Sequence, residues 1–205
     1  GFFSCDAGVE ASLWQSMVRR AANRSFNAIT VDGDTSTNDT VLAFAAGEAL
    51  PEDQLVALEE GLTTAMQQLA QAIARDGEGA TCLIEVQVEG AADDASALSV
   101  ARTVCGSSLV KTAVHGRDPN WGRIVAAAGR SGVMFDPEAL ALWIGGHQLM
   151  QAGKPVPFDR DAASASLRED RVVLRLRLGD GPGSGVGWGC DLSDQYVRIN
   201  ADYTT

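Results

Sequence analysis

The sequence predicts an α/β fold of the α+β kind, a layered sandwich in which helices cover β-sheets. Two observations carry this prediction. Residues 52–75 place an apolar side chain at every third or fourth position, as an amphipathic helix does. Residues 81–89 instead alternate apolar with mostly polar side chains, which is typical of a strand with one buried face. Segments of both kinds follow one another without a repeat period, so we expect layers around one core.

The other elements follow from the same rules. Helical spacing or an excess of Ala, Val and Leu predicts further helices over residues 9–25, 95–113 and 124–128, and Asn120 is a candidate N-cap for the last. Short apolar runs predict strands over residues 28–31 and 41–46, and a β-rich texture with many turns suggests further strands over 140–145, 171–178 and 195–201. Alternate glycines from 179 to 189 predict a flexible turn or a bulged strand. The texture becomes β-rich after residue 132, which favours a main lobe over 1–132 and a smaller lobe over 133–205.

The composition of the chain excludes some classes of function. The chain has 205 residues, 45% of them hydrophobic, which is ordinary for a globular protein. Its formal net charge of −11 without a basic stripe argues against nucleic acid and anionic membranes as partners. No apolar run reaches the roughly 18 residues of a membrane span. We therefore expect a cytoplasmic protein with neither a nucleic-acid nor a membrane partner.

Four cysteines, Cys5, Cys82, Cys105 and Cys190, are spread along the chain without a CxxC pair. This spacing argues against a zinc site, and four cysteines are too sparse for a disulfide scaffold. We expect reduced, mostly buried thiols and no bound metal.

The densest polar segment is residues 32–40, between two predicted strands. Asp32, Asp34 and Ser36 occupy the first ligand positions of a calcium loop, but Thr37 and Ala43 stand where such a loop needs Gly and Glu. Calcium is therefore not expected. A turn held by its own side chains and a loop lining a polar pocket both remain open.

Three other stretches can carry chemistry. Glu78 lies between Gly77 and Gly79, where it can either follow a helix C-cap or pair with a substrate ammonium group. Residues 116–123 (GRDPNWGR) either start a helix or hold an anion with two arginines. Residues 199–205, at the end of the sequence, form either a plain edge strand or a polar site. The residues alone do not decide these alternatives.

Standard hydrolase templates are absent from the sequence. It contains no G-x-S-x-G pattern, and its two histidines, His115 and His147, lie in no recognisable triad context.

Taken together, several long motifs resemble the β chain of the ornithine acetyltransferase family, also called glutamate N-acetyltransferases. The matching stretches are SFNAIT and VDGDTSTNDT (25–40), DGEGAT (76–81), KTA and GRDPNWGR (111–113 and 116–123), WGCDLS (188–193) and INADY (199–203). They occur in family order across nearly the whole chain, which makes the resemblance specific.

The resemblance implies an N-terminal-nucleophile-like architecture and a precursor that cleaves itself before a threonine. That threonine becomes the first residue of the β chain and carries acetyl from N-acetylornithine to glutamate in arginine biosynthesis, releasing ornithine. The oxyanion hole would lie on the α chain, which makes the α chain an obligatory partner, in an α2β2 or larger assembly. No cofactor is implied, and use of acetyl-CoA as a second acetyl donor stays open.

The same resemblance implies the site residues. Glu78, Asn200 and Thr205 match the family's substrate contacts, whereas Thr204 and Cys82 stand where many members have Arg and Lys. No catalytic residue is expected in this numbering, because the nucleophilic threonine is expected just before Gly1.

Two alternatives accompany this reading. One is an N-terminal-nucleophile amidase or aminopeptidase of similar architecture, and the other is a non-catalytic binding subunit. The paired partners for an amino acid's ammonium and carboxylate groups favour the transferase over the amidase.

Overall fold

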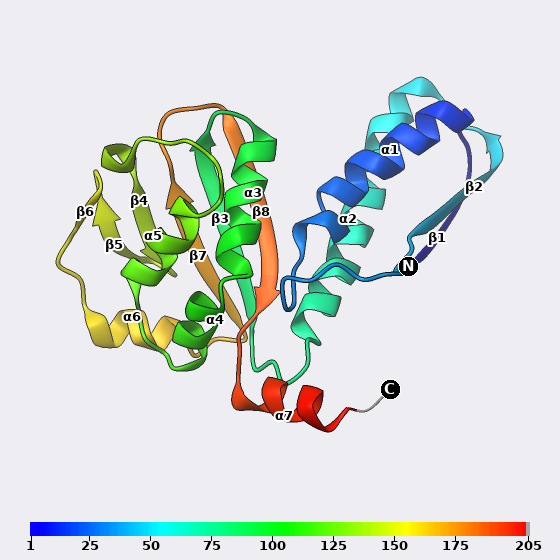
Figure 1. Ribbon diagram of the computed structural model, residues 1–205. Helices are drawn as coiled ribbons and strands as arrows, with labels where there is room; N and C mark the ends of the chain where they lie inside the picture. The colour runs from blue at the N-terminus through cyan, green and yellow to red at the C-terminus, as the bar shows by residue number, and fades with distance from the viewer. Residues whose placement is uncertain (204–205) are drawn as a thin grey trace. The chain divides into compact units, whose positions relative to one another are not determined.

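The computed structural model describes residues 1–203 of the chain (Figure 1). Its strands are β1 (Phe2–Gly8), β2 (Leu42–Ala49), β3 (Leu83–Ala91), β4 (Ala141–Ile144), β5 (His147–Gln151), β6 (Lys154–Pro155), β7 (Arg171–Arg177) and β8 (Gly183–Cys190). Its α-helices are α1 (Ala11–Asn23), α2 (Glu52–Arg75), α3 (Asp94–Cys105), α4 (Ser108–His115), α5 (Trp121–Gly129), α6 (Arg160–Ser166) and α7 (Asp194–Asp202). Two 3-10 helices, η1 (Phe26–Ala28) and η2 (Pro137–Ala139), complete the described elements.

The chain divides into two compact units. The N-terminal unit comprises residues 1–27 and 34–70, and the sheet unit comprises residues 28–33 and 71 onward. This division differs from the expected boundary at residue 132. The reason is that β3, which precedes residue 132, pairs with β7 and β8, which follow it, so one sheet joins both sides of that position.

The sheet unit is built on a six-stranded mixed sheet of order β6-β5-β4-β7-β3-β8. Strands β3 and β7 are parallel, and the remaining neighbours are antiparallel. Helices α3, α4 and α5 lie over one face of the sheet (Figure 1). Their apolar side chains, among them Val100, Val114 and Ile124, form one core with Ile84 and Leu174 of the sheet. The predicted class, a mixed α/β fold with helices covering a sheet, is confirmed.

The glycines of β8 bring helix α3 close to the sheet. A Cβ atom added at Gly185 would lie 2.7 Å from the backbone nitrogen of Leu98, and one at Gly187 would lie 3.1 Å from the backbone of Ala101. Side chains at these positions would push the helix away from the strand. From Gly183 onward the glycine-rich stretch is thus a paired strand with a register shift opposite Glu89 and Ala91, whereas Gly179 and Gly181 lie outside it, in the segment before the strand.

The N-terminal unit contains a two-stranded parallel ribbon, β1 and β2, with helical residues against one of its faces. Phe3 of β1 and Ala43 of β2 pack with Trp14 and Met66 in this unit's core. The indole nitrogen of Trp14 donates a hydrogen bond to the Ala43 carbonyl at 3.0 Å, which ties α1 to the ribbon.

Three expected elements differ from those observed. The predicted strand over 28–31 is instead the end of η1 and an isolated parallel bridge between Ile29 and Trp188, because this short run packs into a buried cluster with Trp188. The predicted helix over 95–113 is two helices, α3 and α4. Gly106 caps the first, and the Ser107 side chain accepts from the Val110 amide at the start of the second.

The third difference is the predicted strand over 195–201, which is helix α7. Val197 and Ile199 alternate as they would in a strand, but both side chains are exposed. Contacts with the Gly77–Gly79 turn hold this helix, and the local sequence pattern gives no sign of them.

Candidate substrate-binding site

Glu78 and Asn200 meet although 122 positions separate them. Glu78 lies in the turn between α2 and β3, and Asn200 lies on α7. The Asn200 amide donates to a carboxylate oxygen of Glu78 and to the Tyr196 carbonyl at 3.0 Å. Both side chains are exposed, so a ligand can reach them. The third candidate, Thr205, lies outside the described residues.

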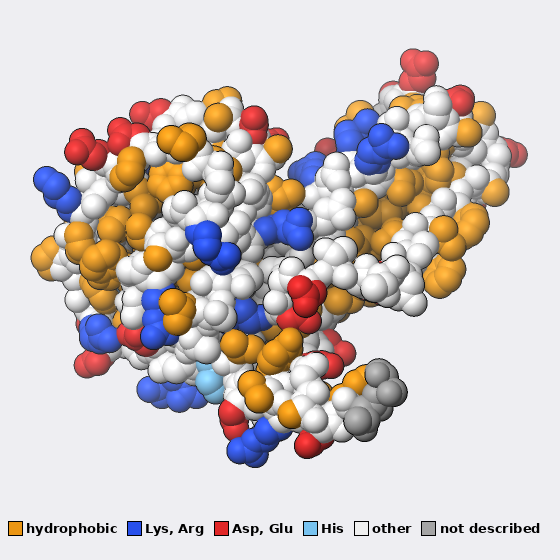
Figure 2. Space-filling view, viewed as in Figure 1, with side chains coloured by type: hydrophobic (Ala, Val, Ile, Leu, Met, Phe, Trp, Pro, Cys, Tyr) orange, Lys and Arg blue, Asp and Glu red, His pale blue; other side chains and the backbone are white. Residues whose placement is uncertain are grey.

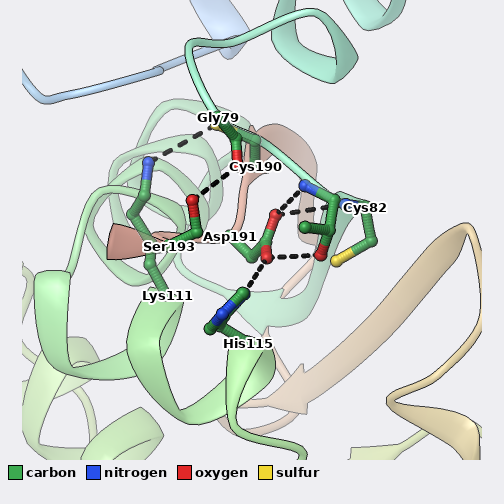
Figure 3. A network of polar contacts seen from close by, with 8 residues as sticks. Gly79, Cys82, Lys111, His115, Cys190, Asp191 and Ser193 are labelled. Carbon is green, nitrogen blue, oxygen red and sulfur yellow. Dashed lines mark hydrogen bonds and ion pairs between the residues drawn. The ribbon is translucent and has the colours of Figure 1, made fainter. Parts of the chain in front are cut away.

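The turn that carries Glu78 fits against α7 because residue 79 is glycine. Gly79 has φ of +69°, and a Cβ atom there would lie 2.8 Å from the Tyr196 nitrogen and from the Gln195 Cβ. The Ser193 hydroxyl donates to the Gly79 carbonyl at 2.7 Å, just ahead of the helix (Figure 3). A side chain at residue 79 would therefore both strain the backbone and displace α7.

A buried carboxylate, Asp191, connects the strand that follows this turn with α4 (Figure 3). It accepts from the Thr81 amide at 2.6 Å, the Thr81 hydroxyl at 2.6 Å, the Cys82 amide at 3.1 Å and His115 Nδ1 at 2.7 Å. Burial alone would raise the pKa of the Asp191 carboxyl. The hydrogen bonds from Thr81, His115 and Cys82 outweigh burial and hold the pKa below its usual value.

The sequence motifs included Asp191 without giving it a role. The signal in the sequence was a carboxylate directly after the glycine-rich stretch and two residues before Ser193. Asp191 and Ser193 together fix the position of the Glu78 turn relative to α7.

A buried lysine lies near the same turn. Lys111 of α4 is 3% exposed, and its ammonium group donates to the Val31 carbonyl and lies 3.6 Å from Cys190 Sγ. A Cβ atom on Gly77 would lie 2.7 Å from that sulfur, so Cys190 fills the space beneath the turn. Burial raises the pKa of the Cys190 thiol against the opposing effect of Lys111, which favours an un-ionised thiol at neutral pH.

All four cysteines are free of disulfides, and Cys82, Cys105 and Cys190 are buried. The prediction of mostly buried free thiols is confirmed. Burial raises the pKa of Cys82 and of Cys105 to about 12, so both are un-ionised thiols at neutral pH.

Asp118, Asn120 and Arg123 of the GRDPNWGR stretch make structural contacts. The Asn120 side chain accepts from the Arg123 amide at 3.1 Å, which confirms the predicted N-cap of α5. Arg123 donates to the Leu109 carbonyl at 3.0 Å, and Asp118 forms an ion pair with Arg160 at 2.7 Å. The two arginines of the stretch are thus not arranged around a common anion at the start of α5.

All residues of the polar segment over 32–40 are exposed. The residues on either side of it, Val31 and Val41, are partly buried. The Ser36 hydroxyl accepts from the amides of Asn38 and Asp39 at 3.4 and 3.3 Å, as a turn held by its own side chains would. Over residues 1–203, no group of three or more His, Cys, Asp or Glu side chains is arranged to hold a metal ion. No helix in that same range is long and apolar enough to cross a membrane.

Known proteins resemble this chain over its whole length. The "Arginine biosynthesis bifunctional protein ArgJ" of Parasynechococcus marenigrum (strain WH8102) is 75% identical over 205 residues, which is 100% of this chain and 50% of the relative. The protein of the same name from Prochlorococcus marinus (strain MIT 9313) is 67% identical over 214 residues, again 100% of this chain and 50% of the relative. The chain thus spans about half the length of the curated relatives it matches.

A solved structure gives the same result for the fold. The crystal structure of the arginine biosynthesis bifunctional protein ArgJ from Bacillus halodurans superposes with a TM-score of 0.94 at 44% identity, covering 98% of each chain. The model of the family described as "ArgJ family" matches residues 1–205 of this chain. The chain therefore belongs to the ArgJ family.

Proposed function

We propose that this chain is the β half of a self-cleaved glutamate N-acetyltransferase that acts in arginine biosynthesis. In the proposed reaction, a threonine hydroxyl attacks the acetyl carbonyl of N-acetylornithine, forms an acetyl-threonine ester and releases ornithine. The glutamate amine then attacks the ester, which yields N-acetylglutamate and restores the threonine. The proposed nucleophile is the threonine that the family resemblance puts just before Gly1.

The contact between Glu78 and Asn200 is the observation that carries this proposal. A carboxylate accepts hydrogen bonds from an ammonium group, so Glu78 is suited to an amino-acid substrate. The two N–H groups of Asn200 are used by Glu78 and by the Tyr196 carbonyl, so a substrate carboxylate would take the Asn200 amide from one of these contacts. Both proposed substrates, N-acetylornithine and glutamate, have a carboxylate, and ornithine and glutamate present ammonium groups. Thr205 is the proposed third contact.

An exposed apolar face on the N-terminal unit supports the partner half of the proposal. Phe2, Leu42 and Phe44 are 81%, 42% and 57% exposed on the ribbon of β1 and β2, where Figure 2 shows gathered hydrophobic side chains. Parallel strands are normally covered on both faces, and two strands alone are marginal. We propose that the α chain covers this face.

The lengths of the relatives agree with two chains. The curated relatives are about twice as long as this chain, whereas the solved chain from B. halodurans is covered to 98%. We propose an α2β2 or larger cytoplasmic assembly whose oxyanion hole lies on the α chain. Acetyl-CoA is the second acetyl donor to assay.

The test uses the full-length precursor, purified as its assembled product and supplied with N-acetylornithine labelled in the acetyl group and with glutamate. The proposal predicts that label appears in N-acetylglutamate at the rate at which ornithine appears. Intact-mass measurement is predicted to show two chains, one of which begins with threonine.

Two other results would contradict the proposal. Release of the label as free acetate, with or without glutamate, would identify an amidase of the same architecture. Ligand binding without turnover in the assembled protein would identify a binding subunit.

A further inference from the structure

A hollow of about 380 Å³ lies in the sheet unit, beside the His115–Asp191 contact. This volume is within the range of small-molecule sites, about 300–1,000 Å³. The residues that line it are Thr81, Cys82, Val114, His115, Arg117, Leu167, Arg168 and Glu169.

Basic groups dominate the rim of the hollow. Arg117 and Arg168 are both exposed, and neither guanidinium group has an acceptor within residues 1–203. Glu169 is the single acidic residue among those that line the hollow. This gathering stands out on a chain with a net charge of −11. Its charge therefore suits an anion.

The histidine ring is held in a fixed orientation. Its Nδ1 contacts the buried carboxylate of Asp191 at 2.7 Å, and Figure 3 shows the ring between this carboxylate and the end of α4. Because Asp191 is ionised at neutral pH, Nδ1 carries the proton that it donates to Asp191. The second ring nitrogen, Nε2, then has a lone pair and can accept a hydrogen bond from a hydroxyl or amine group of a ligand, since the side chain is 38% exposed.

Arg117 is held in an unusual backbone conformation. Its φ is +57°, a region that non-glycine residues rarely occupy. The Ser164 hydroxyl donates to the Arg117 carbonyl at 2.9 Å, and the Arg117 amide donates to the Val114 carbonyl at 3.0 Å. These contacts keep the backbone where the side chain reaches the hollow. Strain maintained in this way is typical of functional sites.

We propose that this hollow binds a small organic anion, through a carboxylate or phosphate group held by Arg117 and Arg168. The guanidinium fork suits both kinds of oxyanion, and both occur on metabolites of this size. Val114, Leu167 and Cys82 provide an apolar surface for the body of the ligand. The hollow is therefore better matched to a substituted oxyanion than to an inorganic one.

Isothermal titration calorimetry on the assembled protein tests the proposal with three probes at constant ionic strength: inorganic phosphate, acetate and butyrate. At least one probe is expected to bind saturably. Tighter binding of butyrate than of acetate identifies a carboxylate held over the apolar surface, and tighter binding of phosphate identifies a phosphate ligand. Heats that show no saturation with all three probes would overturn the proposal.

Variants locate the binding. Arg168→Gln and Arg117→Gly are each expected to weaken binding about tenfold, since each removes one charged hydrogen-bond donor. Arg117→Gly also relieves the positive φ, so loss of binding in this variant does not reflect backbone strain. Arg130→Gln removes an equally exposed arginine at the end of α5 and is expected to change nothing.

A second control separates this hollow from the proposed substrate contacts. Glu78→Gln is expected to retain the binding of the tightest probe, whether or not the protein is an acetyltransferase. Equal weakening in the Arg168→Gln and Arg130→Gln proteins, or loss of binding in the Glu78→Gln protein, would contradict a site at the hollow.

Discussion

Asp191 shows at the scale of one residue how a buried charge can organise a site. Its side chain is fully buried, and burying an isolated carboxylate is costly. Donors from Thr81, Cys82 and His115 surround it, so the charge is compensated. The compensation holds only while the Glu78 turn, α4 and the end of β8 keep their positions. The hydrogen bonds of this one carboxylate therefore hold three segments of the chain in place.

Replacing Asp191 by asparagine should destabilise the protein by about 1–3 kcal/mol at pH 7. The amide offers one acceptor where the carboxylate offers two, so at least one buried donor loses its partner. Urea unfolding followed by circular dichroism measures the difference. An unchanged unfolding midpoint would show that the carboxylate does not hold these segments together.

The same pair of proteins should show a pH dependence with a definite sign. The folded pKa of Asp191 lies below the unfolded value of about 3.9, so its ionisation stabilises the fold fully above that value. This contribution is lost as pH falls through the folded pKa. The stability difference between wild type and Asp191→Asn should therefore be constant from pH 6 to 8 and shrink below about pH 4. A difference that grew towards acid pH would contradict the assigned hydrogen bonds.

Gly79 offers a second test with a matched control. Gly79 and Gly132 both have positive φ, +69° and +77°, but a Cβ atom meets α7 at Gly79 and nothing within 4 Å at Gly132. Alanine at either position should cost about 1 kcal/mol for the left-handed backbone. Only Gly79→Ala should also weaken substrate binding, because it displaces the helix of Asn200. Steady-state KM values for N-acetylornithine distinguish the two variants, and equal KM values would exclude a role for the close approach.

At the scale of elements, strand β8 and helix α3 depend on each other. The strand is rich in glycine and has little intrinsic preference for an extended conformation. It gains stability because α3 packs directly on its backbone at Gly185 and Gly187. The helix in turn buries Val100 and Val104 against the sheet.

Gly185→Val should therefore destabilise the protein by about 2 kcal/mol or more, since its Cβ would lie 2.7 Å from the Leu98 backbone. The control is Gly61→Ala within α2, where nothing lies within 4 Å of the added Cβ. That change should stabilise the protein by about 0.5–1 kcal/mol. Both shifts are measured by thermal unfolding, and a neutral Gly185→Val would refute close packing of α3 on β8.

Elements with a long, regular pattern could be predicted from sequence. The apolar repeat from Leu55 to Ile73 predicted α2, and the alternation from Cys82 to Glu89 predicted most of β3. That alternation also suggested an exposed polar face, but Glu85 is 2% exposed, and Trp188 and Arg171 donate hydrogen bonds to its buried carboxylate. Such compensation depends on partners about a hundred residues away, so a local pattern cannot reveal it.

Only part of the candidate site could be predicted from the sequence. Glu78 and Asn200 followed from the family resemblance, and the structure brings them together. The helical form of α7 was not predictable, since its Val197 and Ile199 have the spacing of a strand and remain exposed. Asp191 and Ser193 act through the backbone of the Gly77–Gly79 turn, and sequence spacing carries no information on that contact.

At the scale of the whole molecule, the described chain has a well-filled core beneath its large sheet and an exposed apolar face on its N-terminal unit. Monomeric soluble proteins rarely leave aromatic side chains such as Phe2 and Phe44 so exposed side by side. This contrast agrees with a chain that is completed by a second polypeptide.

Phe44→Glu should prevent the proposed association with the α chain without unfolding this chain, because the residue is 57% exposed here. A buried charge without a partner would be placed in the interface. Co-expression of separately encoded halves, with an affinity tag on one, measures the association by co-purification. Leu109→Glu on α4, also 57% exposed, is the control expected to retain it. Equal co-purification of both variants would place the interface elsewhere.

Glu78, held beside Asn200, is proposed to bind the amino-acid substrates of an acetyltransferase. The most direct measurement is kcat/KM for acetyl transfer by the assembled protein with Glu78→Gln, compared with the exposed control Glu138→Gln. We predict a loss of about 10- to 150-fold for Glu78→Gln, which corresponds to one charged hydrogen bond of about 1.5–3 kcal/mol, and no change for the control. Equal kcat/KM in both variants and the wild type would contradict the claim.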